Sequence, residues 1–94
     1  RQIAADYGKY RIRVNSARLG WLWGEPVRQA VKRVCDHTGM AEADFIAGVT
    51  AEIPLGVIPP EEECAHSVLM LISNHARMVT GAALDINGGE WMAP

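Results

Sequence analysis

The order of the predicted elements, a strand, then helices, then a second strand, most constrains how this chain can fold. Apolar and basic residues alternate in RIRV, which predicts a short strand over Ile12–Asn15. The sequence AALDI predicts a second strand over Ala82–Ile86, closed by Asn87-Gly88-Gly89. This order is typical of a parallel crossover unit. Two parallel strands alone leave both outer edges unpaired and one face uncovered, so we expect an α/β unit that packs against more sheet.

Helical patterns fill most of the chain between the two strands. Pro26 suits a first helical turn, and the helix that it opens is predicted to end before Gly39. A weaker helical pattern covers Ala41–Ile53, and a third helix is predicted to begin at Pro60, where three glutamates complement the helix dipole. Ahead of the first strand, Arg1–Tyr7 reads as the end of a helix.

Apolar residues at helical spacing predict which side of each helix is buried. In the first helix they are Val27, Ala30, Val31 and Val34, and in the third Cys64, Ala65, Val68, Leu71 and Ile72. The segment Ser16–Glu25 contains glycines and no such spacing, so we expect a loop there.

The composition predicts a small globular unit and gives no reason to expect a strongly charged partner. The 94 residues suffice for one small domain. The net charge is −2, with both signs scattered along the chain, which gives no reason to expect nucleic acid or an acidic membrane surface as a partner. Two cysteines without other secretory features fit a reducing compartment, so we expect a cytoplasmic location.

A Cys-x-His triplet occurs twice, as Cys35-Asp36-His37 and as Cys64-Ala65-His66, and this is a donor set that zinc accepts. Both triplets fall in predicted helices, where residues two apart point about 200° away from each other and cannot chelate one ion. We therefore expect no metal site, with Cys64 in the core and both histidines exposed.

The residues RVN, followed much later by TG and DINGG, make this chain resemble the C-terminal third of the short-chain dehydrogenase/reductase family. The resemblance implies the C-terminal part of a Rossmann-type doubly wound parallel sheet, namely its last two strands with the intervening helices. It implies three parts in one fragment: 1–25 as the end of a helix, the penultimate strand and the nicotinamide-side loop, 26–53 as substrate-lid helices, and 54–94 as the last helix, the edge strand and the C-terminal tail.

The same resemblance assigns site residues to the loop after the first strand. It implies that Gly20, Trp21 and Leu22 contact NAD or NADP, and that Trp21, Trp23 and Val27 contact a small alcohol or ketone. Gly20 would let backbone approach the cofactor, and Leu22 would offer main-chain groups to the nicotinamide carboxamide. Two positions depart from the family pattern, since leucine replaces a proline at 19 and glycine replaces a threonine at 24.

No catalytic residue is expected in this chain. The resemblance implies that the glycine-rich loop, the serine and the Tyr-x-x-x-Lys pair of an NAD(P)-dependent oxidoreductase lie before Arg1, so that the isolated chain is inactive. Tyr7-Gly8-Lys9 has the wrong spacing for that pair. The resemblance also implies homo-oligomers formed through Pro60–Ile72 and Ala82–Ile86.

Simpler interpretations accompany these assignments. The tryptophans could pack a small core, and Gly20 could close a tight turn. We interpret Asp85 as structural and Glu61–Glu63 as a solvated helix start. The alternative to an oxidoreductase segment is a non-catalytic interaction module that pairs with a partner through its open strand edge.

Overall fold

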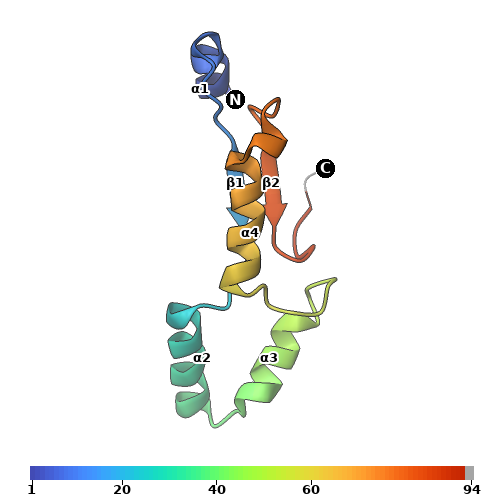
Figure 1. Cartoon of the computed structure of the whole chain (residues 1–94). Helices are drawn as coiled ribbons and strands as arrows, with labels where there is room; N and C mark the ends of the chain where they lie inside the picture. Colours follow the sequence, from blue (N-terminus) through green and yellow to red (C-terminus); the bar gives the residue numbers. More distant parts are fainter. Residues whose placement is uncertain (93–94) are drawn as a thin grey trace.

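The computed structural model describes residues 1–92, and it shows an α/β unit built on a two-stranded parallel sheet (Figure 1). Ser16 pairs with Ala83 and Leu19 pairs with Ile86, which confirms the predicted parallel crossover. In chain order the elements are α1 (Gln2–Tyr7), the 3₁₀ turn η1 (Gly8–Tyr10), β1 (Ser16–Leu19), α2 (Glu25–Thr38), α3 (Glu42–Thr50), α4 (Glu61–Ile72), the 3₁₀ turn η2 (Asn74–Ala76) and β2 (Ala83–Ile86).

The helices begin and end where local chemistry predicts. Gly24 is the residue before α2, and Pro26 lies in the first turn of that helix. Gly39 ends α2 in the left-handed conformation, with φ of 77°. Three glutamates occupy the first turn of α4, and they are exposed, as expected of a solvated helix start.

The first strand lies later than predicted. Ile12–Asn15 is not paired in the sheet, and β1 instead covers Ser16–Leu19, within the predicted loop. The reason is the position of the partner, because β2 begins only at Ala83, which faces Ser16. The residues before Ser16 lie opposite the turn that precedes β2. The alternation in RIRV therefore belongs to an unpaired segment that leads into β1.

Two side chains in this approach bind the turn before β2 and the end of α4. Arg13 Nη1 donates to the carbonyl of Leu71 at 2.8 Å and to that of Val79 at 3.0 Å. Asn15 Nδ2 donates to the Val79 carbonyl at 3.0 Å, and its Oδ1 accepts from the N–H of Ala82 at 3.0 Å. The RVN residues thus fix the register of β2 against β1.

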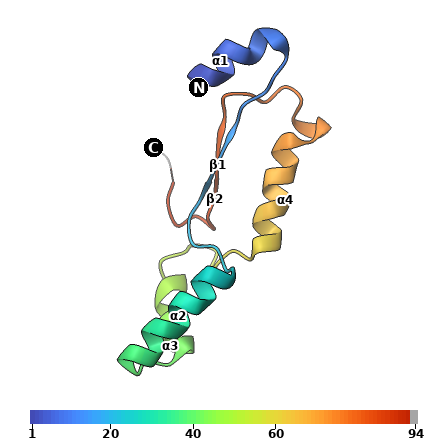
Figure 2. The same cartoon turned by 90° about the vertical axis from the view of Figure 1, so that its left-hand side faces the viewer.

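The helices leave much of the sheet open. Helix α4 runs along one face of the sheet, and α2 and α3 project beyond the ends toward which both strands point (Figures 1 and 2). The Cα radius of gyration is 17.0 Å, whereas a compact domain of this length would have about 12 Å. The accessible surface is 7097 Å², against about 5,400 Å² for a compact monomer of this mass. The described chain therefore does not close a full core of its own.

The predicted helix faces are only partly buried for the same reason. Val31, Cys64 and Leu71 are buried, as predicted, but Ala65 is exposed and Ile72 is 70% exposed. Val34 on α2 is also exposed, while Cys35 beside it is buried. In the part of the chain that is described, no element covers the side of α4 that carries Ile72.

Candidate functional site

The loop Gly20–Gly24 follows the carboxyl end of β1, which is the end of a parallel strand where doubly wound sheets bind ligands. Its backbone is anchored at three amides. The N–H of Trp21 donates to Glu90 Oε1 at 3.3 Å, that of Trp23 to the Pro59 carbonyl at 2.8 Å, and that of Gly24 to the Leu22 carbonyl at 3.0 Å. Within residues 1–92 the N–H of Leu22 donates no hydrogen bond. The N–H of Gly20 likewise donates none within these residues, so Leu22 carries the free donor that lies between the two anchored amides of Trp21 and Trp23.

The neighbours of Gly20 leave no room for a side chain there, and its predicted contact with the cofactor stays a prediction. A Cβ built at Gly20 would lie 2.7 Å from Glu90 Oε1 and 3.0 Å from the Cβ of Asn87. Both neighbours belong to the segment that follows β2. The space that the glycine leaves is thus filled by this chain itself.

A groove of about 520 Å³ lies between Trp21 and helix α3. Its apolar lining comes from Trp21, Met40, Phe45 and Val49, and Glu90 closes one side. The structure does not bring the three residues predicted to bind substrate together in this groove. Only Trp21 lines it, whereas Trp23 pairs with Pro60 in an isolated bridge and Val27 lies half-buried on α2.

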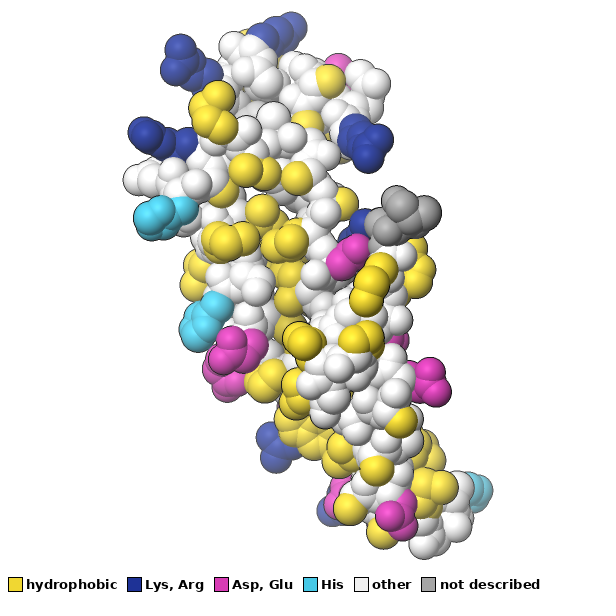
Figure 3. Space-filling view, turned by 90° about the vertical axis from the view of Figure 1, so that its right-hand side faces the viewer, with side chains coloured by type: hydrophobic (Ala, Val, Ile, Leu, Met, Phe, Trp, Pro, Cys, Tyr) yellow, Lys and Arg dark blue, Asp and Glu magenta, His cyan; other side chains and the backbone are white. Residues whose placement is uncertain are grey.

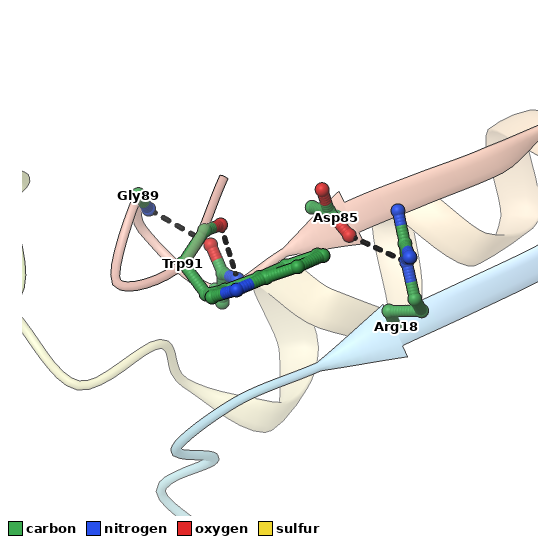
Figure 4. A network of polar contacts seen from close by, with 5 residues as sticks. Arg18, Asp85, Gly89 and Trp91 are labelled. Carbon is green, nitrogen blue, oxygen red and sulfur yellow. Dashed lines mark hydrogen bonds and ion pairs between the residues drawn. The ribbon is translucent and has the colours of Figure 1, made fainter. Parts of the chain in front are cut away.

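The segment after β2 folds back over the sheet (Figure 4). Arg18 Nε lies 2.8 Å from Asp85 Oδ1, an oxygen shielded from solvent, and the two residues are register partners in β1 and β2. The Arg18 guanidinium also lies over the Trp91 ring, 4.9 Å from its centroid. These contacts agree with the structural interpretation of Asp85.

The family model described as Enoyl-(Acyl carrier protein) reductase matches residues 1–90. The chain belongs to the short-chain dehydrogenase/reductase family. The match covers the loop, the groove and most of the segment that folds back, so the geometry described above lies in the homologous region. The fold class and family predicted from the sequence are confirmed.

Relatives of this short-chain dehydrogenase/reductase segment are about three times its length. It is 38% identical over 92 residues to peroxisomal 2,4-dienoyl-CoA reductase from Pongo abelii. The alignment covers 98% of this chain and 29% of that protein. It superimposes with a TM-score of 0.87 on a short chain dehydrogenase family protein from Francisella tularensis, at 28% identity, covering 95% of this chain and 37% of that one. A variant of actinorhodin polyketide ketoreductase solved with NADPH has a TM-score of 0.79, 25% identity and coverages of 95% and 34%.

The glycine at position 24, where the family pattern has a threonine, lies against the side chain of Glu61. A Cβ built at Gly24 would collide with the Glu61 carboxylate. Glu61 thus stands beside the N-terminus of α2, where its negative charge complements the helix dipole. This neighbour was not predictable from the local sequence, because Glu61 lies far along the chain in the first turn of another helix.

The two Cys-x-His triplets remain apart from this site. Cys64 is buried, and His37 and His66 are exposed, as predicted, and Cys35 is buried as well; both cysteines are free thiols. Burial raises the pKa of both thiols, helped by the charges of Glu42 and Asp36 at Cys35 and of Glu63 at Cys64. Among residues 1–92 no three His, Cys, Asp or Glu side chains converge to hold a metal ion.

None of the helices in residues 1–92 is both long and apolar enough to cross a membrane.

Proposed function

We propose that this chain is the C-terminal part of an NAD(P)-dependent oxidoreductase that transfers a hydride between nicotinamide and a small alcohol or ketone. The observation that carries the proposal is the free N–H of Leu22, held in an anchored loop at the carboxyl end of a parallel strand. Family membership and a relative solved with NADPH support it.

Leu22 would bind the cofactor through its main chain. A carboxamide oxygen accepts hydrogen bonds and carries no formal charge, so a single free amide donor suits it. The anchored amides of Trp21 and Trp23 hold the Leu22 donor in place on both sides. When bound, the nicotinamide supplies or accepts the hydride. Gly20 and Trp21 then shape the backbone on which it rests.

The groove beside Trp21 would hold the substrate. Its lining is mainly apolar, which suits the carbon skeleton of a small alcohol or ketone, and α2 and α3 would cover it. Covering helices exclude water from a hydride transfer. Trp21 is the substrate contact that the groove supports, and contacts by Trp23 and Val27 stay predictions. Proton transfer needs a group from another part of the protein, so the isolated chain should be inactive.

Homo-oligomerisation is proposed through α4 and β2. Hydrophobic side chains gather between α4 and the outer edge of β2 (Figure 3), around a groove of about 700 Å³ lined by residues such as Leu55, Val57, Met70 and Ile86. Leu69, Met70 and Ile72 on α4 are each more than half exposed. Apolar surface of this kind is typical of subunit interfaces. We also propose a cytoplasmic location, on the two free cysteines.

The alternative function, a non-catalytic interaction module, is favoured by one observation. All four residues of β1 are exposed, and its outer edge pairs with no strand in residues 1–92. Such an edge is a template for a partner strand. An oxidoreductase also fills that edge, with further strands of its own sheet, so the open edge does not separate the two functions, whereas cofactor binding does.

The test compares Leu22→Pro with Leu22→Ala in the full-length protein that contains this chain. Proline removes the N–H, whereas alanine keeps it. We expect the proline variant to raise the Kd for NADH or NADPH about tenfold, in line with one hydrogen bond, and the alanine variant to stay within about twofold. Calorimetry on the isolated chain should show no submillimolar affinity. Lack of nicotinamide binding by the wild-type full-length protein would favour the interaction module instead.

A further inference from the structure

The carboxylate of Glu90 contacts the proposed cofactor loop from the far end of the chain. Its Oε1 accepts a hydrogen bond from the N–H of Trp21 at 3.3 Å, although the two residues are 69 positions apart. The same side chain fills the space beside Gly20 and lines the groove next to Trp21. Glu90 therefore contacts the backbone of this loop and lines the same groove as Trp21.

Glu90 is an exposed residue of a hydrogen-bonded segment, Asn87–Met92, which we call the hook. Asn87, only 6% exposed, organises it: its Oδ1 accepts from the N–H of Gly89 at 2.9 Å and its Nδ2 donates to the carbonyl of Trp91 at 3.0 Å. The Glu90 N–H donates to the Asn87 carbonyl at 3.2 Å. These hydrogen bonds hold the backbone on both sides of Glu90. Its carboxylate therefore contacts the loop without the entropy cost of ordering a free segment.

The hook is also attached to the sheet. Trp91 lies against the Arg18 guanidinium, and Arg18 pairs with Asp85 across the two strands (Figure 4). A guanidinium over an indole face adds attraction beyond packing. Through Trp91, the hook containing Glu90 is attached to β1, the strand whose carboxyl end carries the loop.

We infer that Glu90 is a positioning residue for the nicotinamide-binding loop, an inference that rests on the proposed function. Its carboxylate anchors the Trp21 amide, and the Pro59 carbonyl anchors that of Trp23, so the free N–H of Leu22 lies between two fixed peptides. A binding group that is fixed in advance loses less conformational freedom when the ligand arrives. Glu90 acts through the loop and contacts neither the hydride nor the Leu22 amide.

The test uses the full-length protein and compares Glu90→Ala with Glu90→Gln. Glutamine keeps an oxygen that can accept the Trp21 N–H, whereas alanine removes it. We measure hydrogen exchange at the Trp21 amide, together with Kd and KM for NADH or NADPH and kcat. Alanine should accelerate exchange and raise Kd and KM about threefold to tenfold, the range of one hydrogen bond, with kcat within about twofold. Glutamine should restore values near those of the wild type.

Two further variants sharpen the result. Gly20→Ala should reproduce the effect of Glu90→Ala, because its Cβ would displace the carboxylate. Glu62→Ala removes an exposed carboxylate from α4, outside the loop and the groove, and should change neither readout. Unchanged Trp21 exchange in Glu90→Ala would overturn the inference, and so would faster exchange without a change in Kd. A wild-type protein that binds no nicotinamide would instead overturn the proposed function.

Discussion

Arg13 donates a hydrogen bond from Nη1 to the carbonyl of Leu71 at 2.8 Å, across 58 positions of sequence. Leu71 lies in the last turn of α4, where carbonyls have no partner within the helix and a positive charge is favourable. The same Nη1 donates to Val79, so one side chain joins the approach to β1, the end of α4 and the turn before β2.

Replacing Arg13 should therefore destabilise the fold. We expect Arg13→Met to lower the free energy of unfolding by about 1.5–3 kcal/mol, because the methylene stem is kept and charged, partly buried hydrogen bonds to two carbonyls are lost. Urea denaturation of the full-length protein measures this. Arg33→Met, at an exposed position of α2, is the matched control and should change the value by less than about 0.5 kcal/mol. Equal effects of the two variants would contradict the role given to Arg13.

Gly88→Ala should be more harmful than an ordinary glycine substitution. Gly88 has φ of 67°, and a Cβ there would lie 2.7 Å from Cγ2 of the buried Ile53. We expect a loss of about 2–4 kcal/mol, from left-handed strain together with overpacking. Gly56→Ala is the control, because its φ is 72° with nothing within 4 Å of the added atom, so it should cost only about 1 kcal/mol.

The overpacking at Gly88 can be separated from the strain by a second change. Ile53→Ala removes the atom that the new Cβ would strike, so the combination with Gly88→Ala should be less destabilising than the sum of the two single variants. Thermal unfolding of the four proteins gives the interaction energy. Strict additivity would show that Ile53 is not the obstacle.

Trp21 and Trp23 should differ in what their loss affects. Trp21→Ala removes a wall of the groove, so we expect a rise of about tenfold in the KM for the alcohol or ketone with a small change in stability. Trp23→Ala removes a half-buried side chain at the junction with Pro60 and should lower stability by about 1–3 kcal/mol while KM stays within about twofold. Steady-state kinetics and thermal unfolding separate the two. A larger KM effect from Trp23→Ala than from Trp21→Ala would support the predicted substrate contact of Trp23.

The buried thiols should make stability fall at alkaline pH. Burial raises the pKa of Cys35 and Cys64 above the ordinary value of 9.0. The folded state then holds these protons more tightly than the unfolded state, so the contribution to stability is complete below pH 9.0 and is lost as pH rises through the folded pKa.

A comparison with Cys35→Ala and Cys64→Ala isolates that contribution. The wild type should lose more stability than either variant between pH 8 and pH 11, a window chosen around the ordinary thiol pKa of about 9. Both thiols should also react slowly with iodoacetamide at pH 7 until the protein is unfolded. Parallel stability profiles for all three proteins would show that the thiols titrate normally.

Local chemistry made the helices predictable. Pro26, Gly39 and Pro60 mark helix boundaries through backbone geometry that operates within a few residues, and the structure places α2 and α4 accordingly. The first strand was misplaced, because its limits depend on where Ala83 begins to pair and not on its own alternation. Of the predicted site residues, the groove contains only Trp21, and the backbone of Trp23 instead pairs with Pro60, which lies far along the chain.

The sequence by itself determined the α/β class and the boundaries of α2 and α4, because these depend on periodicity and on residues close together in the chain, and the motifs RVN, TG and DINGG carried the resemblance to the family. The tertiary structure decided which residues stabilise and shape the loop that follows β1. Glu90 and Pro59 bind its amides, and Glu61 stands beside its last glycine, all from positions far along the chain. Such contacts leave no periodic signal, because they arise only when the crossover brings the end of β2 and the start of α4 against the end of β1.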